Sequence, residues 1–316
     1  MRREKISDAL TEINEKYIVE AANYSHKRKD SFRRWIPFAA GICILLGIGC
    51  FFKFGGIRSE NSSISEDQSQ VQMTEKGVLI PEMEIASEYL ESAKAESTSD
   101  MVAFFIYEGR SYVQYEYIEN AETLIGEKIG TANGTISEWT KEDGYVNGAG
   151  SVSGDFYTVN GYDSDFMLCM KQEQDAILTF INNNGFTIQK GYELFEERLH
   201  LKDTYVSVYC QERNDWNNGV DVSVQIQEKD FDIIDQFLTR IDDAEFMLLS
   251  DIPLDDDSNN VYDSKELYHI YFTSENGMVT HLRLFEGGYV SFNGISQICV
   301  QIDQTFFEDF IQILKY

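Results

Sequence analysis

Histidine is scarce in this chain, which limits the chemistry that the sequence can support. Only four histidines occur among 316 residues. The sequence contains no HExxH motif, no GxSxG motif and no clustered His/Cys pattern, which are typical of metalloproteases, serine hydrolases and zinc sites. We therefore predict that the protein is not an enzyme.

Basic residues are also few beyond the N-terminus. The whole chain holds 26 Lys and Arg against 54 Asp and Glu, and residues 59–316 hold only 15 of the basic and 48 of the acidic ones. Binding to nucleic acid needs clusters of Lys and Arg that contact phosphates. We therefore expect no nucleic-acid partner, and this acidity is typical of a region kept soluble outside the cell.

Cysteine is the third residue type in short supply, with five in the chain. Cys43 and Cys50 lie in an apolar run near the N-terminus, while Cys169, Cys210 and Cys299 lie in short apolar segments further on. Apolar surroundings are typical of a small buried core residue. One disulfide with one free thiol, or a metal-binding or nucleophilic role, are the alternatives.

Long apolar runs are absent except for residues 35–52, WIPFAAGICILLGIGCFF. As a helix this run would cover roughly 27 Å of the roughly 30 Å hydrocarbon layer. Basic residues beside a span stay in the cytoplasm, and they crowd its N-terminal side at Lys27, Arg28, Lys29, Arg33 and Arg34. We predict a single-pass protein of the cell membrane, with its N-terminus in the cytoplasm and its C-terminal region outside.

Three other interpretations of this run fit less well. A cleaved signal peptide would need an A-x-A site, and none follows the run. A lipoprotein anchor at Cys50 would need small residues before the cysteine, but the sequence GIGC is followed by two phenylalanines. A buried core helix would show polar residues on one face, and none occurs.

The run divides the chain into five predicted segments. They are a cytoplasmic amphipathic helix with its basic flank (1–34), a transmembrane helix (35–54), a flexible polar linker (55–99), a β-rich extracellular part (100–202) and an α+β extracellular part (203–316). The linker is predicted because residues 58–77, RSENSSISEDQSQVQMTEKG, are almost all small or polar. Residues 78–85, VLIPEMEI, are expected to be extended.

Alternating apolar and polar residues predict strands over most of the region beyond Met101. The first two predicted strands, 101–108 and 111–118, flank EGR (108–110), which predicts a hairpin turn. The other predicted strands are 154–161, 166–170, 176–183, 204–210, 220–226, 245–249, 267–273, 278–285, 289–292 and 297–302. Three helices are predicted: near 121–125, around Phe231 to Ile241, and around Phe307 to Leu314, the last with Thr305 and Glu308 as its capping box. The expected fold class is α+β, with helices packed on antiparallel sheet.

A faint internal repeat is visible in the C-terminal part. A shift of 76 residues superposes Val224-Gln225-Ile226 on Val300-Gln301-Ile302, and Phe231 on Phe307. This pattern indicates two strands and a packing helix that occur twice. Chance similarity between amphipathic segments is the alternative.

The N-terminal segment predicts an amphipathic helix with a narrow apolar stripe. The stripe consists of Ile6, Leu10, Ile13, Tyr17, Ala21 and Tyr24. So short a cytoplasmic segment has no core of its own, and its acidic residues disfavour an anionic membrane surface. We therefore expect a cytosolic protein partner. A helix that merely precedes the membrane anchor is the alternative.

Asp8 to Ala22, DALTEINEKYIVEAA, followed by the Lys/Arg cluster, the apolar run and an acidic C-terminal region, resembles uncharacterised single-pass proteins of clostridial-type Gram-positive bacteria. The strings FFIYEGRSYVQYEYI, GSVSGDFYTVNGYD and LFEERLHL are similar to the same group. Some of these proteins look like anti-sigma factors, so the resemblance implies a sigma factor as the cytosolic partner. The zinc motif of anti-sigma factors, His-x3-Cys-x2-Cys, does not occur here.

One acidic segment matches the ligand spacing of a calcium loop. Oxygen ligands stand at Asp255, Asp257, Asn259, Asp263 and Glu266, with Val261 supplying the position of a backbone carbonyl. Asn260 replaces the usual glycine, and Pro253 disfavours an entering helix. We expect no cofactor unless calcium binds here, and a solvated acidic loop is the other interpretation.

Two further groups of polar residues are notable. His269 and His281 lie in predicted strands joined by a short turn, so we expect them to be neighbours, as ordinary sheet histidines or as a metal pair. Carboxylate pairs such as Glu196-Glu197 and Asp242-Asp243 are interpreted as exposed charge. Acid–base work would need their members to lie in different environments.

Together these patterns indicate a membrane-bound regulatory or sensor protein. Its extracellular region would bind an unknown signal, and its cytoplasmic helix would engage a cytosolic partner. A membrane-tethered surface binding or envelope-assembly module without a signalling role is the alternative.

Overall fold

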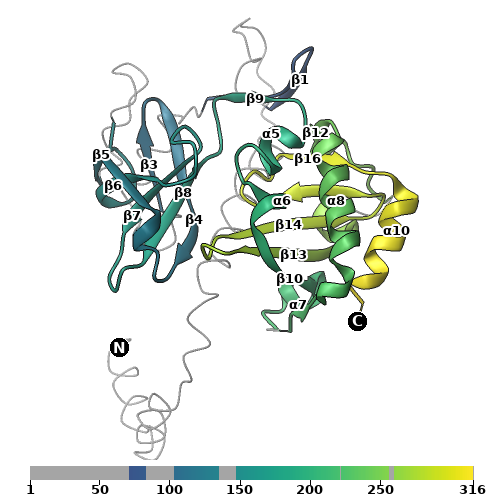
Figure 1. The fold of residues 1–316 in the computed structure, drawn as a ribbon. Helices are drawn as coiled ribbons and strands as arrows, with labels where there is room; N and C mark the ends of the chain where they lie inside the picture. The colour runs from purple at the N-terminus through teal and green to yellow at the C-terminus, as the bar shows by residue number, and fades with distance from the viewer. Residues whose placement is uncertain (1–70, 83–102, 135–146, 221, 256–259, 316) are drawn as a thin grey trace, which may run out of the picture. The chain divides into compact units, whose positions relative to one another are not determined.

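A computed structural model describes residues 71–82, 103–134, 147–220, 222–255 and 260–315 (Figure 1). All of them belong to one compact unit, residues 55–316. Among these described residues no helix is long and apolar enough to cross a membrane. The apolar run 35–52 and the stripe from Ile6 to Tyr24 lie outside the described ranges.

The described chain forms three sheets with helices, which confirms the α+β class. All strand pairings within these sheets are antiparallel. The strands of the six-stranded sheet fall within residues 100–202, and those of the seven-stranded sheet fall within residues 203–316.

The six-stranded sheet begins with a tight hairpin. Across the sheet its strands are β3 (Phe104–Tyr107), β4 (Arg110–Ile118), β8 (Ile177–Asn182), β7 (Met167–Lys171), β6 (Ser153–Val159) and β5 (Ile125–Asn133), with a short 3-10 helix, η2 (Glu122–Leu124), before β5. Glu108 and Gly109 between β3 and β4 have φ of 50° and 74°. A two-residue hairpin loop of type I′ needs both values positive, so the predicted turn is confirmed.

The small sheet lies partly within the predicted linker. It consists of β1 (Gln72–Thr74), β2 (Gly77–Ile80) and β9 (Phe186–Ile188). Val78 and Ile80 are fully buried in the largest hydrophobic cluster. The flexible linker predicted for residues 55–99 is therefore wrong over 72–80, because these two apolar side chains tie the segment to the core, whereas the extended conformation expected for residues 78–85 is confirmed at 78–80.

The seven-stranded sheet is the larger structural element. Its order is β11 (Val224–Gln225), β10 (Tyr205–Glu212), β13 (Glu266–Ser274), β14 (Val279–Phe285), β15 (Tyr289–Phe292), β16 (Ile298–Gln301) and β12 (Phe246–Leu248). Two helices, α8 (Phe231–Asp243) and α10 (Gln304–Ile313), lie across one face (Figure 1). Because side chains alternate along a strand, Ile270 and Leu282 join the helix-side core, whereas His269 and His281 point to the other face.

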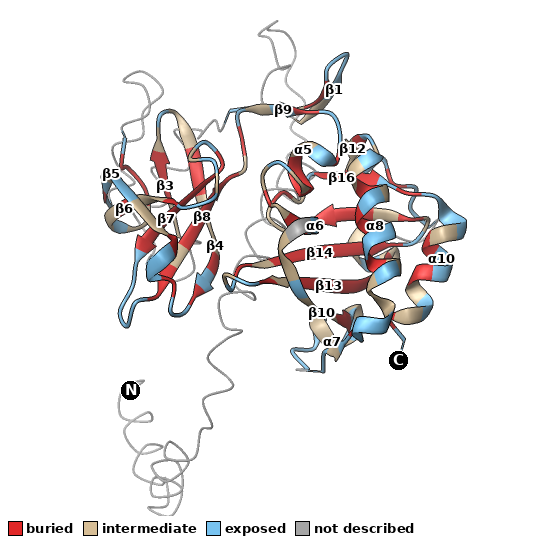
Figure 2. Cartoon of the chain, viewed as in Figure 1, coloured by how far each residue is buried: buried red, intermediate tan, exposed pale blue. Residues whose placement is uncertain are grey.

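The two long helices form where the apolar spacing predicts them. Their buried residues face the sheet (Figure 2), and the rings of Phe237 in α8 and Phe310 in α10 stack at 4.3 Å. The predicted capping box is wrong, because α10 begins earlier. Asp303 is the N-cap, and its carboxylate accepts a hydrogen bond from the Phe306 amide at 2.8 Å. An aspartate at this position satisfies an amide at the start of the helix.

Several short helices are not predicted by the sequence pattern. They are α5 (Tyr192–Phe195), α6 (Leu201–Thr204), α7 (Arg213–Asn217), α9 (Val261–Ser264), η4 (Glu228–Asp230) and η5 (Leu249–Asp251). Each is too short to show a helical period, so local packing decides its conformation. Two of them, α5 and α6, pack against α8.

The internal repeat is present in its strand–helix part. Val224 and Val300 both lie in strands that precede a helix, β11 before α8 and β16 before α10. The preceding parts differ, since β10 pairs directly with β11 whereas β15 separates β14 from β16. In the predicted unit of two strands and a helix, the second strand and the helix are therefore equivalent in the two copies, whereas the first strand is not.

The three cysteines of the described region confirm the prediction of core residues. Cys169, Cys210 and Cys299 are buried and form no disulfide. Burial raises the pKa of all three thiols, to about 11 for Cys169 and Cys210 and about 12 for Cys299. They remain protonated at neutral pH and are poor nucleophiles.

Candidate ligand-binding groove

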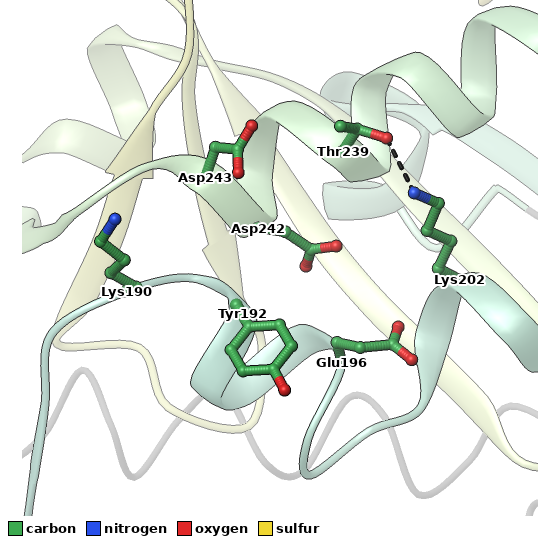
Figure 3. A pocket seen from close by; sticks show the side chains of 7 residues that line it. All are labelled: Lys190, Tyr192, Glu196, Lys202, Thr239, Asp242 and Asp243. Carbon is green, nitrogen blue, oxygen red and sulfur yellow. Dashed lines mark hydrogen bonds between the residues drawn. The ribbon is translucent and has the colours of Figure 1, made fainter.

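A groove of about 480 Å³ opens between α5, α6 and the C-terminal half of α8 (Figure 3). Its lining residues are Lys190, Tyr192, Glu196, Lys202, Thr239, Asp242 and Asp243. In the view of Figure 3, Asp242, Glu196 and Lys202 lie toward one side and Lys190 toward the other. The lining thus combines three carboxyl groups, two ammonium groups, a hydroxyl and an aromatic ring.

Backbone contacts fix the two walls of the groove to each other. The amide of Gly191 donates to the carbonyl oxygen of Ala244 at 2.9 Å, and the amide of Phe246 donates to that of Gln189 at 2.7 Å. These bonds join the start of α5 to the end of α8 and the strand after it. The groove is therefore framed by well-tied backbone, as a preorganised site requires.

Gly191 permits this close approach of the two backbone segments, and we predict that the substitution Gly191→Ala forces them apart. An alanine Cβ would lie 1.8 Å from the carbonyl oxygen of Ile241, although φ of −52° at this residue suits any amino acid. The steric conflict should destabilise the protein by about 1–3 kcal/mol. Thermal unfolding measures the loss. Gln189→Ala, a change at an exposed neighbouring side chain, is the control, and equal stability of the two variants would contradict the prediction.

The charges of the groove are not neutralised by partners within the described part of the chain. The Lys202 ammonium donates to the Thr239 hydroxyl at 2.9 Å instead of to a carboxylate, and the described ion pairs include none of the five charged lining residues. Burial, and next the neighbouring Glu196 carboxylate, raise the pKa of Asp242 to about 6. Lys202 opposes this shift, but its attraction for Asp242 is weaker than the combined effects of burial and Glu196, so the carboxyl groups are only partly compensated.

Glu196 adds to this imbalance. Its Oε2 atom is shielded from solvent and has no hydrogen-bond partner among the described residues. A shielded carboxylate oxygen without a partner costs free energy. The nearby C-terminus of α8 carries the partial negative charge of the helix dipole, which favours a cation and disfavours further negative charge. The sequence-based interpretation of Glu196 and Asp242 as exposed charge is therefore wrong for one member of each pair.

A separate polar cluster lies on the face of the seven-stranded sheet opposite the helices. It comprises Glu266, His269 and Tyr271 of β13, His281 and Arg283 of β14, and Arg213 and Trp216 of α7. Nδ1 of His269 lies 2.8 Å from Nε2 of His281, which confirms that the two histidines are neighbours. The Trp216 ring stacks on His269 at 4.3 Å.

The histidines of this polar cluster are neutral at ordinary pH. Burial, followed by His281 and the two arginines, lowers the pKa of His269 well below its usual value, and burial followed by Arg283 does the same for His281. Glu266 balances the arginines, since its Oε1 accepts from Arg283 and its Oε2 lies 3.7 Å from Arg213. Hydrogen bonds, ion pairs and ring contacts thus join β13, β14 and α7 at this cluster.

The calcium prediction stays a prediction. Asp257 and Asn259 lie outside the described residues. The other three candidate ligands each contact a basic side chain: Asp255 contacts Lys265, Asp263 contacts Arg213 at 2.8 Å, and Glu266 contacts Arg283. Across the described part of the chain, no group of three or more His, Cys, Asp or Glu residues has the geometry to hold a metal ion. These contacts favour an ion-paired segment over a calcium loop.

The six-stranded sheet contains one further unusual carboxyl, that of Glu116 in β4. It is 7% exposed, and its Oε2 accepts no hydrogen bond from any residue in the described ranges. Burial raises its pKa to about 8 from the ordinary 4.5. Because the folded-state pKa is raised, the stability that protonation supplies is complete below about pH 4.5 and is lost as the pH rises through about 8.

We expect Glu116→Gln to remove this dependence on pH. The variant should resemble the natural protein at pH 5 and be more stable by about 2 kcal/mol at pH 9, with the unpaired amide of glutamine offsetting part of the gain. Thermal unfolding across this pH range is the measurement. Glu173→Gln, in an exposed turn, controls for loss of net charge, and parallel curves for all three proteins would refute the expectation.

Comparisons with protein-family models, with curated proteins and with solved structures find no match to this chain. The groove also carries no sequence signal, because its lining residues come from segments up to about 50 residues apart and include no motif. A pairing of Glu196 with Asp242 becomes visible only once α5 and α8 are placed together.

Proposed function

We propose that this chain is a single-pass membrane sensor. Its folded C-terminal region lies outside the cell and binds a small ligand in the groove beside α8, and its N-terminal helix engages a cytosolic protein. The observation that carries the proposal is the order along the chain of a basic segment, the apolar run 35–52 and an acidic folded region. This order is typical of a protein anchored with its N-terminus inside.

The cytosolic half of the proposal rests on the apolar stripe of residues 6–24. An amphipathic helix that docks in a groove of a partner uses residues at this spacing. The resemblance of the segment to anti-sigma-like proteins favours a sigma factor as the partner. Binding of the outer ligand would then change the availability of the sigma factor.

Cysteine labelling of intact cells tests the topology. Glu173→Cys places a thiol in the exposed turn 171–175, whereas the native thiols of the folded region are buried. Ser7→Cys places a thiol before the apolar run. A membrane-impermeant maleimide should label the first variant on intact cells and the second only after lysis, with the unsubstituted chain as background. Labelling in the opposite pattern would reverse the proposed orientation.

Co-purification from membranes tests the partner. Ile13→Asp places a charge in the apolar stripe and should remove the bound protein, whereas Val19→Asp places the same charge on the opposite side of the helix and should retain it. Deletion of residues 1–25 should match Ile13→Asp. If the deletion leaves the set of bound proteins unchanged, the signalling role fails and a tethered surface-binding module is the better description.

A further inference from the structure

We propose that the groove beside α8 binds a small zwitterion, a molecule that carries one ammonium and one carboxylate group, such as a free amino acid. This assignment deepens the proposed function by naming the chemical class of the sensed ligand, and it rests on that function only for its role in signalling. The lining residues of the groove supply a separate site for each charge.

The ammonium group is assigned to the space between Asp242 and Glu196. Both carboxyl groups line the groove, and the Glu196 Oε2 atom lacks a hydrogen-bond partner in the part of the chain that the structure describes. The repulsion between the two groups, which contributes to the raised pKa of Asp242, would be relieved by a cation. The end of α8 at Asp243 adds the negative pole of the helix dipole to the same region. An ammonium group provides three donors for these oxygens.

The carboxylate group is assigned to Lys202. The Lys202 ammonium points at the Thr239 hydroxyl, whose own proton is donated to the carbonyl oxygen of Asp235 at 2.8 Å, so the ammonium group supplies the donors at this position. Lys202 forms no ion pair among the described residues. In an α-amino acid the two charged groups lie on one carbon, which suits a site where Lys202 and Asp242 line the same end of the groove (Figure 3).

The remaining features of the groove fit a small organic molecule better than a metal ion or a polyamine. Its volume of about 480 Å³ lies in the range of about 300–1,000 Å³ usual for small ligands. The half-exposed ring of Tyr192 offers an apolar wall for a side chain. A polyamine would pair with the carboxylates but leave Lys190 and Lys202 without anions, and the described residues contain no group suited to a metal ion.

Calorimetric titration of the full-length protein in detergent tests the assignment. Each standard L-amino acid is titrated singly, and the tightest is compared with its decarboxylated amine and its deaminated acid. We expect one or more amino acids to bind, and both truncated compounds to bind more weakly by at least about tenfold. No binding of any amino acid up to about 10 mM, or equal binding of the amine, would overturn the proposal.

Substitutions assign each charge to its partner. Asp242→Asn and Glu196→Gln should each weaken the amino acid by at least about tenfold while raising the melting temperature of the free protein, because they remove repulsion. Glu275→Gln, in the exposed turn between β13 and β14, should change neither. Lys202→Met should weaken the amino acid but not its amine. Equal losses for both compounds in Lys202→Met would overturn the assignment of the carboxylate.

The pH dependence provides an independent readout. Asp242 becomes protonated as the pH falls through about 6, so the affinity for the amino acid should fall below this pH in the natural protein and much less in Asp242→Asn.

The ligand proposal and the membrane proposal can fail separately, because the labelling of Glu173→Cys does not depend on the ligand. Amino-acid binding with the opposite labelling pattern would overturn only the membrane orientation, whereas correct labelling without binding would overturn only the ligand class.

Discussion

Replacing Glu266 with glutamine should lower the stability of the protein by about 3–5 kcal/mol, which corresponds to a fall of roughly 6–20 °C in melting temperature. Glu266 is almost completely buried and is the acidic partner of two arginines, Arg283 and Arg213. Glutamine keeps the shape but removes the charge, and its amide group presents donors to the donors of Arg283. The arginine would then remain buried without compensation, which is the costly state of a broken buried ion pair.

Thermal unfolding of the full-length protein measures this effect. Glu275→Gln removes a carboxylate from the exposed turn between β13 and β14 and should change stability by no more than about 0.5 kcal/mol. The double variant Glu266→Gln with Arg283→Met should recover part of the loss, because it removes the stranded charge as well. If the loss of stability in the double variant equals the sum of the losses in the single variants Glu266→Gln and Arg283→Met, the broken ion pair is not the cause of the destabilisation.

Replacing Phe237 with alanine should cost a similar amount, about 3–5 kcal/mol. Phe237 is fully buried between α8 and the sheet, and its ring stacks on that of Phe310 at 4.3 Å with an interplanar angle of 3°. The substitution removes both the transfer free energy of the ring and the contacts of its neighbours, and a cavity remains where the two helices meet. Loss of this stack also removes one of the contacts between α10 and α8.

A double-mutant cycle with Phe310→Ala separates the stacking from the burial. The coupling between the two rings should be about 0.5–1.5 kcal/mol beyond the area that they bury. Phe306→Ala is the matched control, since this ring is partly exposed beneath Arg240 and its removal should cost about 1 kcal/mol. Equal losses for Phe237→Ala and Phe306→Ala would show that the helix interface is not packed as described.

The sequence predicts the strands and long helices well because their signal is local. Alternation of side chains marks β13 and β14, and a spacing of three and four residues marks α8 and α10. The turn at Glu108 and Gly109 is predicted because tight hairpins need residues that tolerate positive φ. The neighbouring positions of His269 and His281 are predicted because two strands joined by a short turn pair with each other.

Elements that depend on tertiary contacts are not predicted. β5 shows no apolar alternation, and its Gly130 instead lies against the ring of Phe156 on the adjacent strand, where a Cβ would be 2.2 Å from the ring. β1 lies in a segment of small and polar residues whose sequence is typical of a linker, and it pairs with β2, which is held by the buried Val78 and Ile80. The groove escapes prediction because Glu196 and Asp242 belong to pairs that are ordinary in an acidic chain.

The order of strands in the seven-stranded sheet has a consequence for solubility. One edge strand, β11, is only two residues long. At the other edge strand, β12, the Phe246 amide already donates a hydrogen bond to the Gln189 carbonyl oxygen. The unpaired amide and carbonyl groups of an exposed edge strand can form hydrogen bonds with a strand of another chain, which leads to aggregation. Natural proteins shorten or cover such edge strands. Concentrated preparations should accordingly resist fibril growth from this sheet, even though its strands are rich in tyrosine, phenylalanine and isoleucine.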